Sequence, residues 1–320
     1  MSLLVFSTEP YAGMRDALCR TYGYEAGRIE WRRFPDGERH LRVLAPVRGR
    51  DVVLLGGTTQ ESQTTAMLDL ACSLVDQGAG RLTIVLPFYG YGTMERATIE
   101  GEVVTARTRA LLFSAVPRAP GGNRLVLLDP HDESLPFFFA ASWRASVLPT
   151  DTLVEMVARR LGGTGLVLAS PDAGRAARVQ RVAERLGAAT AFVHKRRLGP
   201  ERTEVVGLVG EVRDRNVVLH DDLVRSGSTL LGAARALREA GAARVSAFVT
   251  HAVLPGETLA RIEDSRLLDA LVVTDSHPRA SDLAGAFLQV VPVAPVVGAW
   301  LLRTAGVEGV TDRVDVGVVP

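Results

Sequence analysis

Short aliphatic runs alternate with longer amphipathic segments along the whole chain. Two of the longer segments, residues 65–77 and 229–240, have the apolar spacing of helices. The short runs are rich in Val, Ile and Leu, as in strands that are covered on both faces. They span residues 52–55, 82–86, 125–128, 217–219, 245–250 and 270–273. This alternation predicts the α/β class, with mainly parallel sheets flanked by helices.

The two halves of the chain resemble each other. Residues 3–7 are similar to 166–170, residues 50–54 to 215–219, and residues 80–85 to 243–248. Three matching segments in one order predict a duplication, so we expect two tandem domains, residues 1–148 and 149–320. The apolar segment 286–302 is expected to form a buried strand and the start of a helix. The terminal segment, about 300–320, is expected to pack on the N-terminal domain.

Composition and charge exclude several classes of protein. The chain has 37 Lys and Arg against 36 Asp and Glu, which argues against a general nucleic-acid-binding surface. Pro292 and Pro295 interrupt the longest apolar stretch, so no membrane span is expected. The two cysteines, Cys19 and Cys72, have no metal-binding spacing and favour neither a zinc site nor a disulfide scaffold. We expect a globular cytoplasmic protein.

The segment from His220 to Thr229 is the most informative loop. It is expected to leave a strand with Asp221 and Asp222 and to enter a helix through small residues. Gly227 lets the backbone approach a ligand, and amides at a helix N-terminus bind phosphate. The two acids would then reach ribose hydroxyls or an attached metal. An acidic turn followed by a Ser/Thr helix cap explains the pattern equally well.

The first half contains a counterpart of this loop, residues 56–60, with the sequence Gly-Gly-Thr-Thr-Gln. It has no acidic residue. We therefore expect the second half to bind a sugar phosphate and the first half to have another role.

Seven short motifs, in order, resemble those of the ribose-phosphate pyrophosphokinases, and the resemblance covers essentially the whole chain. The motifs are Phe34-Pro35-Asp36-Gly37-Glu38, Pro87-Phe88-Tyr89-Gly90-Tyr91, Asp129-Pro130-His131, Ser170-Pro171-Asp172-Ala173-Gly174, Lys195-Arg196-Arg197, Asp221-Asp222 and Thr250-His251. Members of this family have two duplicated phosphoribosyltransferase-like domains. They transfer the diphosphoryl group of ATP to ribose 5-phosphate, which gives AMP and phosphoribosyl diphosphate for nucleotide biosynthesis. Such transfers depend on positioning and charge neutralisation.

The resemblance implies roles for individual residues. Lys195 and Arg197 match catalytic cations of a mobile loop, although a solvated basic strand end is the simpler interpretation of such a run. His131 and Asp172 match magnesium-associated positions, and Asp172 is the better ligand because Mg²⁺ prefers oxygen. The expected ribose-phosphate site comprises Asp221, Asp222, Arg225, Ser226, Gly227, Ser228 and Thr229, and the expected ATP site comprises Phe34, Asp36, Gly37, Glu38 and Arg96.

Some positions depart from the family pattern. Thr93 stands where the family usually has an ATP-contacting arginine, and Arg96 is the candidate replacement. Arg225 replaces an acid of the sugar-phosphate loop, and Ser228 replaces its second glycine. Phe34–Glu38, taken alone, is simply a turn. These departures indicate a divergent member of the family.

The resemblance also implies Mg²⁺ as cofactor, ATP and ribose 5-phosphate as substrates, and a homo-oligomer built from dimers, with a hexamer as one form. Neither a nucleic acid nor a membrane is an expected partner. Two alternatives remain open. One is a non-catalytic regulatory homologue, which the loss of the arginine at Thr93 favours. The other is a phosphoribosyltransferase, against which the tandem architecture argues.

Overall fold

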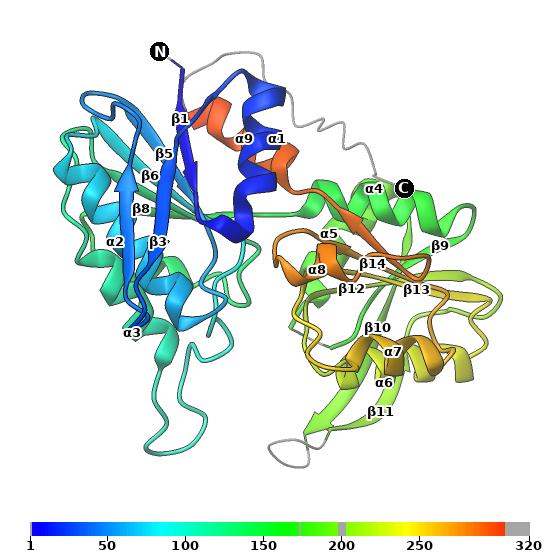
Figure 1. Ribbon diagram of the computed structural model, residues 1–320. Coiled ribbons are helices and arrows are strands. Elements are labelled where there is room, and N and C mark those ends of the chain that lie inside the picture. Colours follow the sequence, from blue (N-terminus) through cyan, green and yellow to red (C-terminus); the bar gives the residue numbers. More distant parts are fainter. Residues whose placement is uncertain (1, 173, 198–202, 305–320) are drawn as a thin grey trace. The chain divides into compact units, whose positions relative to one another are not determined.

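A computed structural model describes residues 2–172, 174–197 and 203–304, which divide into two compact units. The first unit contains the chain up to Pro149 and the segment that begins at Val293. The second unit contains Thr150–Pro292. Each unit is built around one large sheet (Figure 1).

The sheet of the first unit has six strands in the order β2-β1-β5-β6-β7-β8, and every neighbouring pair is parallel. Its strands are β1 (Leu4–Ser7), β2 (Glu25–Ala26), β5 (Asp51–Leu55), β6 (Arg81–Leu86), β7 (Asn123–Leu128) and β8 (Trp143–Leu148). The central strands are buried on both faces, which explains why their sequences show continuous apolar runs.

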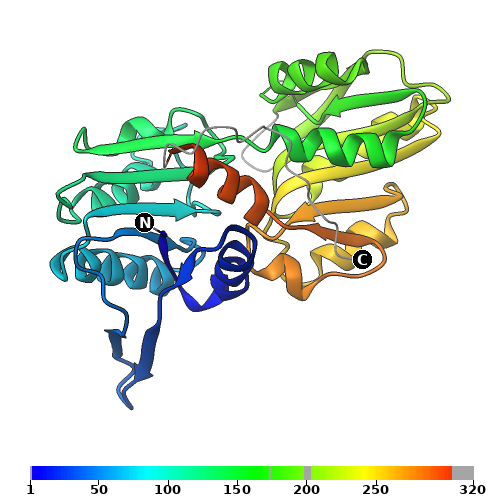
Figure 2. The ribbon, with the colours of Figure 1, turned by 90° about the horizontal axis from the view of Figure 1, so that it is seen from above.

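Helices cover this sheet. Leu70 of α2 (Glu61–Asp76) and Phe113 of α3 (Thr105–Ser114) share a core cluster with Phe6. Helix α1 (Ala12–Tyr22) lies beside α9 (Ala294–Thr304), as Figures 1 and 2 both show. The Tyr22 hydroxyl donates to the Pro295 carbonyl at 2.9 Å. Short 3₁₀ turns occupy Glu9–Tyr11 and Leu135–Phe138.

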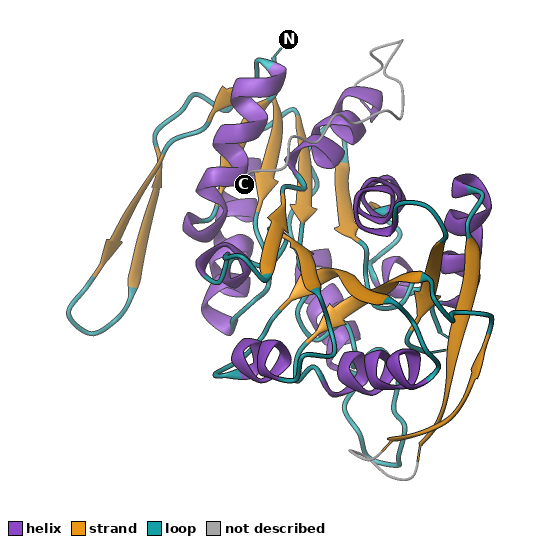
Figure 3. Ribbon diagram, turned by 90° about the vertical axis from the view of Figure 1, so that its right-hand side faces the viewer, coloured by secondary structure: helices purple, strands orange, loops and turns teal. Residues whose placement is uncertain are grey.

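A β-hairpin that the apolar pattern does not predict extends from the first unit (Figure 3). It consists of β3 (Ile29–Arg33) and β4 (Arg39–Val43), which pair antiparallel. Its apolar side chains, including Trp31 and Leu41, pack against the core, while Arg32, Arg33 and Arg42 are exposed. Because charged residues separate the apolar ones, neither strand contains the continuous apolar run from which the other strands were predicted.

The second unit has a seven-stranded sheet in the order β11-β10-β9-β12-β13-β14-β15. Its strands are β9 (Leu166–Ser170), β10 (Ala189–Arg197), β11 (Thr203–Val209), β12 (Asn216–Val224), β13 (Arg244–Ala252), β14 (Ala270–Thr274) and β15 (Leu288–Val291). The strand β11 is antiparallel to β10, and the other neighbouring pairs are parallel. The α/β prediction with mainly parallel sheets is therefore confirmed.

Helices again flank the sheet. Helices α4 (Asp151–Gly162) and α5 (Ala176–Leu186) pack together and against β9. Leu237 of α6 (Ser228–Glu239) and Ile262 of α7 (Thr258–Asp264) belong to another core cluster with strand residues. The short helix α8 (Arg279–Asp282) precedes β15. Among the described residues, no helix combines the length and the apolar character needed to cross a membrane.

Candidate active site

The carboxyl ends of β9 and β12 define the main candidate site of the second unit. The two strands are parallel neighbours, with Leu166 opposite Asn216, so the segments that follow them leave the same edge of the sheet. Residues 171–175 follow β9, and residues 225–227 connect β12 to α6. The topology thus brings together the Asp172 segment, the acid pair and the small-residue loop.

The acid pair lies in a strand, which corrects the expectation that the loop begins at His220. Strand β12 runs to Val224 because His220 and Asp221 continue the ladder with Phe248 and Val249 of β13. Asp221 is 8 % exposed and Asp222 is 3 % exposed. The carboxylates are therefore fixed by the sheet and do not belong to a solvated turn.

Burial controls the chemistry of Asp221. Its carboxylate accepts a hydrogen bond from the Asp222 backbone amide at 2.9 Å. Burial raises the pKa of Asp221 well above its ordinary value, and the negative charges of Asp222 and Asp172 raise it further, while Arg175 opposes the shift. The carboxyl of Asp221 therefore loses its proton less readily than an exposed aspartate does.

Arg175 contacts this pair directly, although sequence reasoning did not single it out. Its Nη2 lies 3.0 Å from Asp222 Oδ2, and its Nε donates to Asp222 Oδ1 at 3.2 Å. Both side chains are largely buried, at 11 % and 5 % exposure. The only available sequence signal was a cation three residues after Asp172, and that spacing has no chemical meaning until the topology is known.

The loop between β12 and α6 has the shape of an anion-binding turn. Gly227 has a φ of +73° and precedes the first residue of α6, Ser228. The Ser226 and Ser228 hydroxyls lie 3.0 Å apart, and Arg261 of α7 donates to the Ser226 carbonyl. The first N–H groups of a helix have no intrahelical acceptors, so they are available to an anion. Arg225 and Ser226 are exposed beside them.

Asp172 occupies the segment after β9 and is partly buried. Its Oδ1 accepts from the Gly174 amide at 2.9 Å, and its backbone carbonyl accepts from the Ser170 hydroxyl at 2.6 Å. Among the described residues, no group of three or more His, Cys, Asp or Glu side chains is arranged to hold a metal ion. Asp172 is therefore not part of a closed set of protein ligands among the described residues.

The corresponding loop of the first unit is filled by its own side chains. A Cβ atom at Gly56 would collide with the Met67 sulfur, and one at Gly57 would collide with the Tyr11 hydroxyl. Thr58 is buried, and its hydroxyl accepts from the Gly90 amide at 2.6 Å. This packing supports the expectation that the first copy has lost the sugar-phosphate role.

The residues Phe34, Asp36, Gly37 and Glu38 form the turn between β3 and β4. The Phe34 amide donates to the Glu38 carbonyl at 2.8 Å, and the Glu38 amide donates to the Asp36 carboxylate at 3.0 Å. Gly37 has a φ of +94°, and Phe34 is 49 % exposed with its ring edge-on to His40. The structure thus brings these four candidates together at an exposed hairpin tip with an accessible aromatic face.

His131 and Arg96 lie in loops of the first unit, after β7 and β6 respectively. The β-carbon of His131 lies near Gly92 of the loop that carries Arg96. Hydrogen bonds from Ser134 lower the pKa of the neighbouring Asp132, and the charges of His131 and Arg96 lower it further. Arg96 is 74 % exposed and lies 3.5 Å from Glu95. These loops place a cation and an imidazole in one neighbourhood.

The catalytic candidates Lys195 and Arg197 end strand β10. Their backbones pair with Val205 and Thr203 of β11, after a register irregularity between His194 and Lys195. Their side chains, and the whole of residues 198–202, lie outside the described part of the structure.

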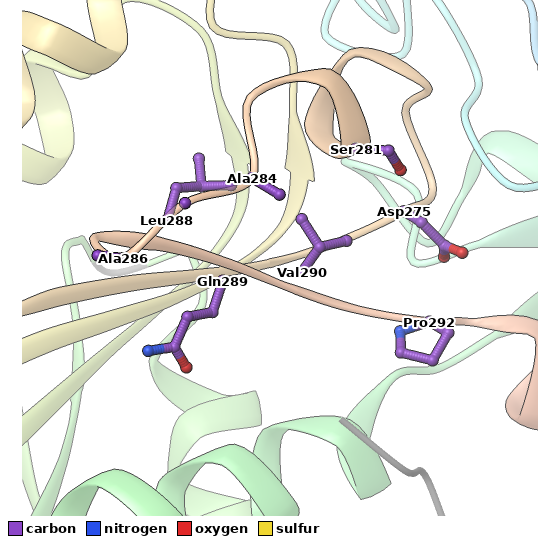
Figure 4. A pocket seen from close by; sticks show the side chains of 9 residues that line it. Asp275, Ser281, Ala284, Ala286, Leu288, Gln289, Val290 and Pro292 are labelled. Carbon is purple, nitrogen blue, oxygen red and sulfur yellow. The ribbon is translucent and has the colours of Figure 1, made fainter. Parts of the chain in front are cut away.

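The second unit also contains a cavity of about 500 Å³ that no candidate residue lines (Figure 4). Its walls come from the end of β14, from α8 and from β15, and they include Asp275, Ser281, Leu288, Val290 and Pro292. Gln289 of this wall accepts from Arg160 of α4 at 2.8 Å. The cavity is therefore built from elements other than those that carry the acid pair.

The chain consists of an N-terminal and a C-terminal domain of the phosphoribosyltransferase class. The N-terminal domain of ribose phosphate pyrophosphokinase matches residues 3–116, and the phosphoribosyl transferase domain matches residues 143–275. A crystal structure of phosphoribosylpyrophosphate synthetase from Mycobacterium smegmatis superimposes with a TM-score of 0.83 and 26% sequence identity. That match covers 97% of this chain and 100% of the other.

Curated relatives narrow the class further. A ribose-phosphate pyrophosphokinase from Hyphomonas neptunium is 34% identical, over 94% of this chain and 96% of the relative. Another, from Caulobacter vibrioides, is 35% identical, over 90% of this chain and 92% of the relative. The chain belongs to the ribose-phosphate pyrophosphokinase family and is an enzyme of that type.

Proposed function

We propose that this chain transfers the diphosphoryl group of ATP to the anomeric hydroxyl of ribose 5-phosphate. The products are AMP and phosphoribosyl diphosphate. The observation that carries the proposal is the buried Asp221–Asp222 pair, which lies directly before an anion-binding turn in a chain of this family. The attacking oxygen forms a bond to the β-phosphorus, and the bond to the α-phosphate of ATP breaks.

The second unit binds the sugar phosphate in this scheme. The 5-phosphate lies at the N-terminus of α6, where the N–H groups of the first turn and the hydroxyls of Ser226 and Ser228 donate to it. Arg225 adds a charge-assisted donor from the exposed side of the turn. The Asp222 carboxylate, which is paired with Arg175, accepts from a ribose hydroxyl, and Asp221 is the second acid of the site.

ATP binding is assigned to the first unit. The exposed ring of Phe34 provides a stacking face for adenine, and Asp36 and Glu38 provide acceptors for its amino group or ribose. Arg96 replaces the missing cation at Thr93 as the partner of the phosphates. Lys195 and Arg197 neutralise charge as the diphosphoryl group moves, by analogy with the family positions they match.

The residues present fit magnesium as an ion shared with the substrates. Asp172 offers one carboxylate, and the described residues contain no closed set of protein ligands. This donor set suits Mg²⁺, which keeps several waters and binds proteins through one or two carboxylates together with substrate phosphates. When bound, the ion would neutralise phosphate charge. We assign Asp172 to it, and His131 by family resemblance only.

The direct test measures AMP release from ATP with Mg²⁺ and inorganic phosphate, with and without ribose 5-phosphate. Mass spectrometry of the products should detect phosphoribosyl diphosphate in amounts equal to AMP. Asp221→Ala should weaken ribose 5-phosphate binding more than ATP binding. If the folded protein binds ribose 5-phosphate but releases no AMP, the proposal is wrong and the non-catalytic alternative, which Thr93 favours, takes its place.

The family resemblance also supports a homo-oligomer. Light scattering coupled to size-exclusion chromatography should give a mass that is a multiple of the 34.3 kDa chain. A monomer at assay concentrations would contradict this part of the proposal.

A further inference from the structure

The ion pair between Arg175 and Asp222 joins two different elements at the candidate sugar site. Arg175 is the residue immediately before α5, and Asp222 lies near the carboxyl end of β12. Both carboxylate oxygens are contacted, Oδ1 by Nε at 3.2 Å and Oδ2 by Nη2 at 3.0 Å. This two-point contact fixes the plane of the carboxylate as well as its position.

Two arginines of helix α5, which follows Arg175, have a different type of partner. Arg178 donates to Asp151 of α4 at 2.8 Å, and Arg185 donates to the other oxygen of Asp151 at 3.1 Å. These pairs join two helices on one face of the sheet. Arg175 instead contacts a carboxylate at the end of the sheet, beside the anion-binding turn.

A role in stability alone explains the pair poorly. Removing two charges from water costs free energy that their attraction often does not repay, so a buried ion pair is weak evidence for stabilisation. A second buried acid, Asp221, adjoins the pair, so two acids are buried side by side at this edge of the sheet. Their position beside the anion-binding turn indicates a role in binding.

The geometry leaves the carboxylate suited to binding a sugar. Arg175 contacts one position on each carboxylate oxygen, and a carboxylate has about four such lone-pair positions in all. A carboxylate held in one plane in this way is a strong acceptor for hydroxyl groups. A vicinal diol, as in a ribose, presents two donors at neighbouring carbons.

We propose that Arg175 is a positioning residue for the sugar-phosphate site, which holds the Asp222 carboxylate in the orientation that accepts from the ribose hydroxyls. This inference rests on the proposed function for the identity of the sugar. Arg175 acts through Asp222 and does not contact the sugar itself. Its effect therefore falls on affinity for the sugar phosphate and not on affinity for ATP.

Two substitutions separate charge from geometry. Arg175→Gln removes the charge, and we expect it to raise the KM for ribose 5-phosphate by at least about thirtyfold, the lower end of the range for a truncated buried charge pair in a binding site. Arg175→Lys keeps the charge but cannot make the two-point contact of a guanidinium, so its KM for ribose 5-phosphate should lie between those of the wild type and Arg175→Gln. The kcat at saturating sugar and the KM for ATP should change about twofold or less.

The matched control is Arg185→Gln in helix α5. The Arg185 side chain is 48% exposed and is paired with Asp151. The substitution should leave both KM values unchanged. The melting temperature of each variant is recorded beside the kinetics. An unchanged KM for ribose 5-phosphate in Arg175→Gln would overturn the inference, as would parallel losses in both KM values and in melting temperature.

Calorimetric titration of ribose 5-phosphate, without ATP, keeps this test independent of turnover. If the wild-type chain forms no product, the proposed function fails, but the affinity difference between wild type and Arg175→Gln still decides the role of Arg175. If product forms and the affinities are equal, the inference about Arg175 fails alone.

Discussion

Replacement of Gly227 by alanine tests the anion-binding turn most directly. Gly227 has a φ of +73°, and an added Cβ would lie 2.9 Å from Cδ1 and 3.0 Å from Cγ1 of Ile262. The left-handed backbone costs an L-residue roughly 1–2 kcal/mol. Overpacking adds about 1 kcal/mol when a terminal methyl group can move aside. The total strain is therefore about 2–3 kcal/mol.

The turn is able to relieve this strain by changing shape, and the effect then appears in binding. A strain of about 2–3 kcal/mol corresponds to a loss of roughly 30-fold to 150-fold in affinity for ribose 5-phosphate. Calorimetric titration measures the affinity, and urea unfolding measures the part of the strain that remains in the folded protein. The sum of the two losses should match the total.

Two further variants separate the causes. Gly187→Ala places a Cβ at a φ of +64° with nothing within 4 Å, so it should show the backbone cost in unfolding and no change in affinity. Adding Ile262→Val to Gly227→Ala removes the nearest atom and should recover part of the loss. Unchanged sugar-phosphate affinity in Gly227→Ala would refute the assignment of the turn. Equal losses with and without Ile262→Val would refute the packing argument.

Three other predictions address separate parts of the chain. Lys195→Ala should lower kcat by orders of magnitude with little change in nucleotide affinity, and unaltered turnover would remove Lys195 from the mechanism. Burial, with the charges of His251 and Arg279, lowers the pKa of His277 from 6.5 to about 4, so the unfolded chain binds more protons between these values. Stability should consequently fall by up to roughly 3 kcal/mol as the pH drops from about 6.5 to 4, and His277→Gln should flatten this dependence in urea titrations. Gly298→Ala would drive a Cβ into the Tyr22 ring and should destabilise the chain by about 1–3 kcal/mol. Gly13→Ala in α1, with nothing within 4 Å, should instead stabilise it by about 0.5–1 kcal/mol, and similar behaviour of the two would contradict the α1–α9 contact.

Buried parallel strands made most of the fold predictable. Each is a continuous apolar run bounded by a helix, as at residues 82–86 and 245–250, and the observed strands include them. The hairpin of β3 and β4 was not predicted because its strands alternate charged and apolar residues at the surface. The expectation that His220 leaves the strand was wrong because polar residues can continue a ladder when their backbones pair with a neighbouring strand.

The candidate site was predictable in part. Asp221, Asp222 and Gly227 stand close together in the sequence, so one local pattern indicated an acid pair and a turn. The Arg175–Asp222 pair depends on the adjacency of β9 and β12, which are separated in the sequence by two other strands. Local spacing contains no information about such a contact.

The closed loop at Gly56 and Gly57 has a consequence for how the two halves of this chain can evolve. Thr8, Tyr11 and Met67 fill the space around these glycines, and Tyr11 is among the largest fully buried side chains. A change that restored one acidic residue there would meet occupied volume, and a change that emptied the volume first would leave a cavity in the core. Neither single step is neutral. The packing around Gly56 and Gly57 therefore opposes the return of an acid pair to this loop of the first half.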